Sequence, residues 1–178
     1  MEVSVTVYCG ANPVDKSYIN LSTKIGEGIA SRGWRLVYGG STLGMMGSCS
    51  NAALHLGGEV VGITLKRFKN YHNGLSEIIF VDTMRERKKL LSDLASAMII
   101  LPGGQGTLEE MSEVVVERRY KIHNKPLVLV NYKGFWDPLI EQFRRMYSDG
   151  FAKDSNFLVI VNSAQDALNR LDQLLRTS

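Results

Sequence analysis

The chain has 178 residues, of which 44% are hydrophobic and 22% charged, so we expect one folded domain over residues 1–178 and exclude a disordered or fibrous protein. Its 21 basic and 18 acidic residues give a formal net charge of +3, too small for a protein that coats nucleic acid. Cys9 and Cys49 have no metal-binding spacing, so we expect reduced thiols. The first residues show no export signal and no apolar run spans a bilayer, so we expect a cytoplasmic protein without a membrane partner.

Short apolar runs rich in β-branched residues alternate with amphipathic stretches along the whole chain. The runs predict strands over residues 3–8, 35–38, 59–64, 78–81, 97–101, 127–130 and 158–161. Helices are predicted between them, with apolar stripes at Tyr18, Leu21, Ile25 and Ile29, at Leu108, Met111, Val114 and Val115, and at Ala164, Leu168, Leu171 and Leu175. Apolar strands separated by helices form parallel sheets covered on both faces. We therefore expect an α/β fold, a single-domain, Rossmann-like, doubly wound parallel sheet.

Two glycine-rich segments, 39–47 and 102–107, follow predicted strands and open predicted helices. In such sheets ligands bind outside the carboxyl ends of the strands, and a helix N-terminus offers free N–H groups to an anion. We expect a phosphate to bind there, with these residues in contact: Gly103, Gly104, Gly106 and Thr107 on one side, Gly39, Gly40 and Gly44 on the other. No lysine follows the glycines and neither segment reads GxGxxG, which excludes a Walker loop and argues against an ordinary dinucleotide site.

Charged residues near these segments have two interpretations. Thr107 and Glu110 have the spacing of a capping box, in which Glu110 would only satisfy the start of its helix, and Thr83 with Glu86 has the same form. We interpret Glu86 as a cap. For Glu110 the preceding glycines favour ligand binding, because a carboxylate one turn from a phosphate lies where the sugar of a nucleotide would sit.

Seven basic residues fall between positions 66 and 89, which fits either an anion-binding surface or a solvated helix face. Two of them, Arg87 and Lys88, lie near a predicted helix start, where a cation opposes the helix dipole, and this favours a role in ligand binding. The histidines, His55, His72 and His123, lack paired spacing. We therefore expect no metal and no cofactor.

Residues 102–110 read P-G-G-x-G-T-x-x-E, and this motif resembles the Lonely-Guy family of cytokinin-activating phosphoribohydrolases, often mislabelled lysine decarboxylases. Four more segments follow in family order along nearly the whole chain, namely residues 7–10, 36–47, 84–88 and 122–126. The chain departs from the family at Val116, Glu117 and Arg119, where members commonly carry threonine, tryptophan and glutamine. The resemblance therefore does not imply which base is preferred.

The resemblance implies a Rossmann-like homodimer that hydrolyses the N-glycosidic bond of an adenosine 5′-monophosphate derivative. The substrate would be a cytokinin riboside 5′-monophosphate or AMP, and the products a free base and ribose 5-phosphate. It also implies that Arg87 and Glu110 are the catalytic pair, with Lys88 and the glycine segments binding substrate. The alternative is a carrier that does not hydrolyse its ligand, because molybdenum-cofactor carrier proteins share a similar fold and a glycine-rich phosphate site.

Overall fold

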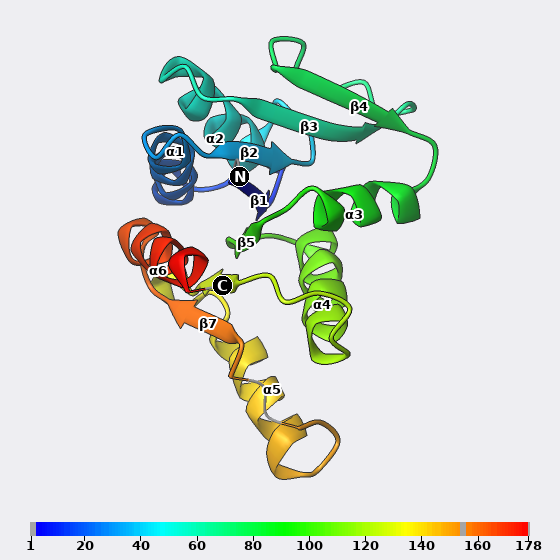
Figure 1. Cartoon of the computed structure of the whole chain (residues 1–178), viewed down its shortest axis with the longest axis vertical. Helices are drawn as coiled ribbons and strands as arrows, with labels where there is room; N and C mark the ends of the chain where they lie inside the picture. The colour runs from blue at the N-terminus through cyan, green and yellow to red at the C-terminus, as the bar shows by residue number, and fades with distance from the viewer. Residues whose placement is uncertain (1–2, 154–155, 178) are drawn as a thin grey trace.

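The computed structural model describes residues 3–153 and 156–177, and within them the strands form one parallel seven-stranded sheet (Figure 1). The strand order is β4-β3-β2-β1-β5-β6-β7. The strands are β1 (Ser4–Tyr8), β2 (Arg35–Tyr38), β3 (Val60–Leu65), β4 (Glu77–Val81), β5 (Ala97–Ile100), β6 (Leu127–Val130) and β7 (Leu158–Val161). The predicted strands and the doubly wound parallel sheet are confirmed, with strand ends that differ from the prediction by no more than about one residue.

The helices lie in two layers, one on each face of the sheet. They are α1 (Lys16–Ala30), α2 (Gly44–His55), α3 (Met84–Asp93), α4 (Gln105–Arg119), α5 (Asp137–Ser148) and α6 (Ala164–Arg176). One core layer gathers residues of α1, α2 and α6, such as Ile25, Cys49 and Leu171, and the other gathers residues of α3, α4 and α5, such as Leu91 and Met111. Figure 1 shows α1 and α6 on one side of the strands, and α3 and α4 on the other.

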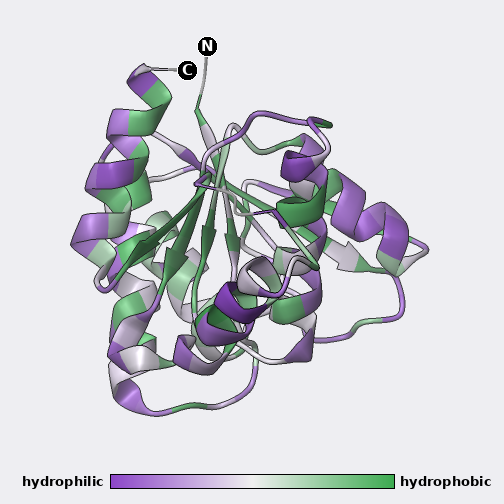
Figure 2. Cartoon of the chain, turned by 90° about the horizontal axis from the view of Figure 1, so that it is seen from below, coloured by the Kyte–Doolittle hydropathy of each residue, from purple (hydrophilic) through white to green (hydrophobic). Residues whose placement is uncertain are grey.

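Successive side chains of a strand point to opposite faces of the sheet, so each strand contributes residues to both core layers. In β5, Ala97 and Ile99 pack against the first layer while Met98 and Ile100 pack against the second. Figure 2 shows apolar strands at the centre and polar outer faces on the helices. Among the described residues, no helix combines the length and the apolar character that crossing a membrane requires.

The predicted apolar stripe on α4 is wrong at its first position. Leu108 is exposed, whereas Thr107, Glu110, Met111 and Val114 are buried. These four residues have the i, i+3, i+4, i+7 spacing of one helix face. The inward face therefore begins with polar residues, which a search for apolar periodicity passes over.

The strand order reverses between β1 and β5. Connections from these neighbouring strands leave in opposite directions, so their loops diverge at the carboxyl edge of the sheet and leave a crevice. The two loops still touch at their bases, where the Gly10 N–H donates to the Pro102 carbonyl at 3.4 Å. This crevice is where a ligand site is expected.

Candidate active site

A cavity of about 660 Å³ opens at the carboxyl edge of the sheet, bounded by the segments that follow β1, β2, β3 and β5. Of the residues predicted to bind or act on substrate, seven line it: Gly39, Arg87, Gly103, Gly104, Gly106, Thr107 and Glu110. Gly40, Gly44 and Lys88 are not among the lining residues. The structure thus brings both glycine segments and the Arg87–Glu110 pair to one place, although they come from distant parts of the chain.

The turn between β5 and α4 forms one wall. Gly104 occupies the N-cap position of α4, and no side chain caps this helix start. A Cβ atom on Gly103 would lie 2.2 Å from the hydroxyl oxygen of Thr107, so a glycine is needed for this buried threonine to pack against the turn. The first N–H groups of α4 therefore face the cavity without a side-chain partner, an arrangement suited to an anion.

The capping-box interpretation is wrong for Glu110 and confirmed for Glu86. Because α4 begins at Gln105, Thr107 lies inside the helix and cannot be its N-cap. In α3, by contrast, Thr83 is the N-cap: its hydroxyl accepts from the Glu86 N–H at 3.1 Å, and the Glu86 carboxylate accepts from the Thr83 N–H at 3.1 Å. Glu110 therefore does not form a capping box at the start of α4.

Arg87 reaches from α3 into the floor of the cavity, where it is only 6% exposed. Its guanidinium donates to the Ile63 carbonyl at 2.9 Å, the Gly39 carbonyl at 3.1 Å and the Glu110 carboxylate at 3.2 Å. These contacts use three of the five N–H donors of a guanidinium. A Cβ atom on Gly39 would lie 2.0 Å from Arg87 Nη2, so this glycine is required for the close approach.

Burial gives Glu110 an unusual titration. Loss of solvent raises the pKa of its carboxyl to about 7, although the neighbouring Arg87 acts in the opposite direction. Near neutral pH the group therefore exists in both protonation states. A carboxyl of this kind beside a guanidinium and an anion-binding turn is suited to charge stabilisation and proton transfer.

Lys88 points away from the cavity. Its ammonium lies between the Glu109 carboxylate at 2.8 Å and the Glu113 carboxylate at 2.7 Å, and hydrogen bonds to both raise its pKa. Lys88 therefore does not line the cavity in which the sequence predicts it to bind substrate, because adjacent residues of a helix face different directions.

Gly40 and Gly44 shape the second glycine segment from outside the cavity. Both have positive φ angles, 79° and 55°. A Cβ atom on Gly44 would lie 2.5 Å from the Asn12 carbonyl oxygen, so the start of α2 can approach the loop after β1 only with glycine there. Their contribution is to backbone geometry.

Sequence reasoning missed one wall of the cavity, formed by the segment after β3. It contributes Arg67, Phe68, Lys69 and Asn70, and it is tied to the glycine segment because the Thr42 N–H donates to the Asn70 carbonyl at 3.2 Å. The available signal was its position directly after a strand, at the same edge of the sheet. The aromatic side chain of Phe135 also lines the cavity, whereas its neighbour Trp136 is buried in the core.

The basic cluster at residues 66–89 does not act as one unit. Arg67 and Lys69 line the cavity, and Arg87 is buried in its floor. Three further members, Lys66, Lys88 and Lys89, pair with carboxylates. The cluster thus divides between residues that line the cavity and residues that form ion pairs.

Cys9 lines the cavity and Cys49 lies behind it in α2; both are free thiols, and burial raises the pKa of each. Within residues 3–153 and 156–177, no three His, Cys, Asp or Glu side chains converge in a way that could hold a metal ion. The charged side chains among the residues that line the cavity are those of Arg67, Lys69, Arg87 and Glu110.

Comparison with known proteins agrees with the motif. The family model described as "Possible lysine decarboxylase" matches residues 46–173. The chain is 42% identical over 153 residues to a cytokinin riboside 5′-monophosphate phosphoribohydrolase of Rhodococcoides fascians, covering 83% of this chain and 77% of that protein. It is 35% identical over 170 residues to the protein of the same name from Mycobacterium tuberculosis, covering 93% and 91%.

A solved structure shares the fold at lower identity. The molybdenum cofactor binding protein from Rippkaea orientalis superposes with a TM-score of 0.79 at 20% identity, covering 98% of each chain. At this identity the likeness concerns the fold alone. The match to the family model and the identity to the two phosphoribohydrolases establish that this chain belongs to the Lonely-Guy family, whose model is the one described as possible lysine decarboxylase.

Proposed function

We propose that this protein hydrolyses the N-glycosidic bond of an adenosine 5′-monophosphate derivative, releasing the free base and ribose 5-phosphate. The observation that carries the proposal is the buried contact between Arg87 and Glu110, 3.2 Å long, inside a cavity that also exposes the start of α4. The names of relatives at 35–42% identity support it. The carrier alternative rests on solved structures at 19–21% identity, which show the fold alone, so the comparisons favour hydrolysis.

The phosphate of the substrate binds at the first turn of α4, on Gly103, Gly104, Gly106 and Thr107. Backbone N–H groups and the helix dipole both favour an anion there. Glu110 follows Gln105 by five residues, which at 1.5 Å per residue places it roughly 7 Å deeper along the helix. That separation is comparable to the span of a ribose, so the sugar of a nucleotide would lie over Glu110.

Cleavage breaks the bond between C1′ and the base nitrogen, and the base takes the electron pair. Positive charge then develops on C1′ and the ring oxygen, as in glycoside hydrolysis, and the Glu110 carboxylate stabilises it. Water adds its oxygen to C1′, and its proton neutralises the departing base, so that atoms and charge balance. Arg87 holds the carboxylate in place by a charge-assisted hydrogen bond.

The base lies against the apolar part of the cavity. Tyr18, Met84 and Phe135 line it from three different elements, and Phe68 adds a further aromatic ring. A planar purine with an apolar N6 substituent matches such a wall. This supports a cytokinin nucleotide, with AMP as the smaller substrate of the same class.

Incubation with AMP and with isopentenyladenosine 5′-monophosphate tests the proposal, with free base and ribose 5-phosphate separated by chromatography. The expected result is release from at least one nucleotide, and loss of that release in Glu110→Gln and Arg87→Ala. Absence of release from both would overturn the proposal. A fluorescent pterin copurifying with the inactive protein would then identify the carrier.

We further propose that the protein is a cytoplasmic homodimer. Its thiols are unpaired, which suits a reducing compartment. Apolar side chains are exposed along one side of α4, at Leu108 and Val116, and continue at Tyr120 directly after the helix. These positions are spaced by multiples of four residues, and Ile122 extends the exposed apolar surface beyond them. Such a stripe on a solvent-facing helix is typical of a surface that pairs with another chain.

A further inference from the structure

The segment 122–126 matches the family, yet it lies outside the cavity. Its side chains approach the opposite end of α3, the helix that carries Arg87. Lys125 Nζ donates to the carbonyls of Ser92 and Asp93, at 2.5 and 3.2 Å. Asp93 is the last residue of α3, so this lysine binds the C-terminal carbonyls of the helix.

The last carbonyls of a helix have no partner within it, and a cation nearby also stabilises the negative end of the helix dipole. In α3 a second donor comes from β1, because the Thr6 hydroxyl donates to the Leu91 carbonyl at 2.7 Å. The C-terminal end of α3 is thus anchored from two sides, by β1 and by the segment that leads into β6. Arg87 lies four to six residues before these anchored carbonyls, on the same helix.

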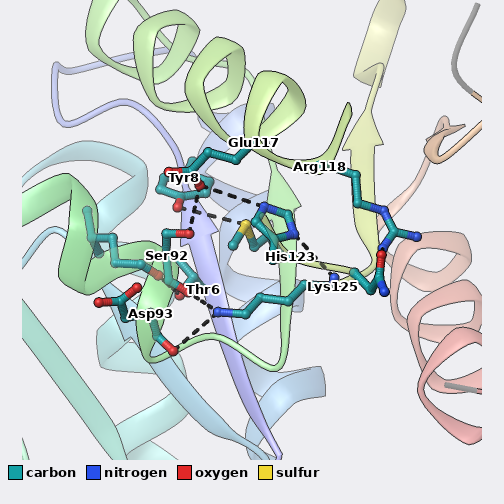
Figure 3. A network of polar contacts seen from close by, with 11 residues as sticks. Thr6, Tyr8, Ser92, Asp93, Glu117, Arg118, His123 and Lys125 are labelled. Carbon is teal, nitrogen blue, oxygen red and sulfur yellow. Dashed lines mark hydrogen bonds and ion pairs between the residues drawn. The ribbon is translucent and has the colours of Figure 1, made fainter. Parts of the chain in front are cut away.

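A second link joins the same end of α3 to α4. The Ser92 hydroxyl donates to Glu117 Oε2 at 3.1 Å, and His123 Nε2 lies 3.7 Å from the same oxygen. Burial, with Lys125 and Arg118 nearby, lowers the pKa of His123, so the ring is mainly neutral at pH 7. Figure 3 shows Glu117 of α4 and Lys125 of the segment after it reaching Ser92, with His123 beside Glu117.

Together these contacts form a row of polar links between α3 and α4. Glu110, Glu113 and Glu117 are spaced three and four residues apart, so they lie along one face of α4. They meet Arg87 at 3.2 Å, Lys88 at 2.7 Å and Ser92 at 3.1 Å on α3. The Arg87–Glu110 contact is the end of this row that reaches the cavity.

We propose that Lys125 and Glu117 are positioning residues, which set the contact between Arg87 and Glu110 by fixing the far end of α3 to the segment before β6 and to α4. Helices are stiff over two or three turns, so a change at Ser92 moves Arg87, five residues earlier. The proposal deepens the hydrolase function and rests on it for its kinetic test. Glu117 is one of the departures from the family, so this chain holds the pair partly with a residue of its own.

The kinetic test compares variants that remove each link with variants that keep it. Lys125→Met and Glu117→Met remove a donor and an acceptor, whereas Lys125→Arg and Glu117→Gln retain them. We expect kcat to fall about tenfold in both Met variants with KM within about twofold, because small misplacements of catalytic groups cost up to about 100-fold. The Arg and Gln variants should stay close to wild type, as should the exposed controls Lys24→Met and Glu27→Met on α1.

A second test needs no activity. The carboxyl of Glu110 can be titrated by ¹³C NMR in the free protein. The charged groups that act on it are Arg87 and Lys88 of α3 and Glu109 of its own helix, and the titratable groups Tyr8 and Cys9 lie at the end of β1. A loosened Arg87 should raise the midpoint by about one pH unit in both Met variants. Loss of the Glu117 charge by itself would lower the midpoint, whereas loss of the Lys125 charge by itself would raise it. The sign therefore separates a loosened Arg87 from simple charge loss in Glu117→Met, and neither Glu117→Gln nor Lys125→Arg should show a rise.

The outcomes separate the two proposals. A wild-type protein that releases no base, with a raised Glu110 midpoint in the Met variants, would overturn the hydrolase function and leave the positioning role standing. An active wild type whose Met variants keep both kcat and the midpoint would overturn the positioning role. If a Met variant does not fold by circular dichroism, Ser92→Ala removes the Glu117 link at its smaller partner and carries the same expectation.

Discussion

The raised pKa of the Glu110 carboxyl predicts how the reaction rate depends on pH. Its pKa is raised to about 7 by burial, and the proposed reaction needs the ionised carboxylate. The ionised fraction grows as pH rises through 7, so kcat/KM should increase about tenfold per pH unit below pH 6 and level off above pH 8. A profile measured between pH 5 and 9 checks this. A rate that falls as pH rises through 7 would instead assign Glu110 to acid catalysis.

A substitution at Gly39 tests whether the close approach of its backbone to the Arg87 guanidinium matters for activity. In Gly39→Ala the new methyl would lie 2.0 Å from Arg87 Nη2 and displace it from the Gly39 carbonyl and from Glu110. We expect kcat/KM to fall about 100-fold while the chain stays folded. The matched control is Gly57→Ala, where the added methyl meets open space and only the positive φ of 74° costs stability, about 1 kcal/mol. Equal activity losses in the two variants would contradict the argument.

At the scale of the element, the start of α3 can be tested apart from the chemistry. Thr83→Ala removes the N-cap hydroxyl that accepts from the Glu86 N–H at 3.1 Å. Loss of such a cap costs about 1 kcal/mol in the free energy of unfolding. Urea denaturation should show this as a lower midpoint with an unchanged slope. An unchanged midpoint would mean that packing, and not the cap, holds the helix start.

Elements were predictable from sequence where local pattern alone determines them. The strands could be placed because each is a short apolar run, and the turn at Gly103 could be placed because a glycine pair after a strand has few alternatives. The direction of Lys88 could not, since it depends on the rotation of α3 about its axis, which packing sets. The wall at Arg67–Asn70 was hidden because loop position depends on contacts with a distant segment.

At the scale of the molecule, the site exists because of the strand order. Arg87, Glu110 and Gly39 belong to three separate helix or loop segments, and they meet only because β1 and β5 are neighbours at the centre of the sheet. No local sequence pattern predicts that these three residues lie together. The family motif does encode it, because five segments in the right order carry the fold with them. This is why the sequence could predict that Arg87 and Glu110 act together, whereas it could not predict the contacts of Lys125 and Glu117 with the far end of α3.

The exposed stripe on α4 makes a prediction about assembly. Val116 is 50% exposed, Tyr120 73% and Ile122 70%, and burial of these side chains against a second copy would remove a large apolar surface from water. Light scattering should give about twice the 19.8 kDa mass of the chain. Val116→Asp with Ile122→Asp should give the monomer, because charges placed in a closed apolar interface are not solvated. The exposed pair Glu27→Gln and Lys24→Met should leave the dimer intact. A monomer mass for the unmodified protein over a wide concentration range would contradict the homodimer. The exposed apolar side chains of α4 would then not form a dimer interface.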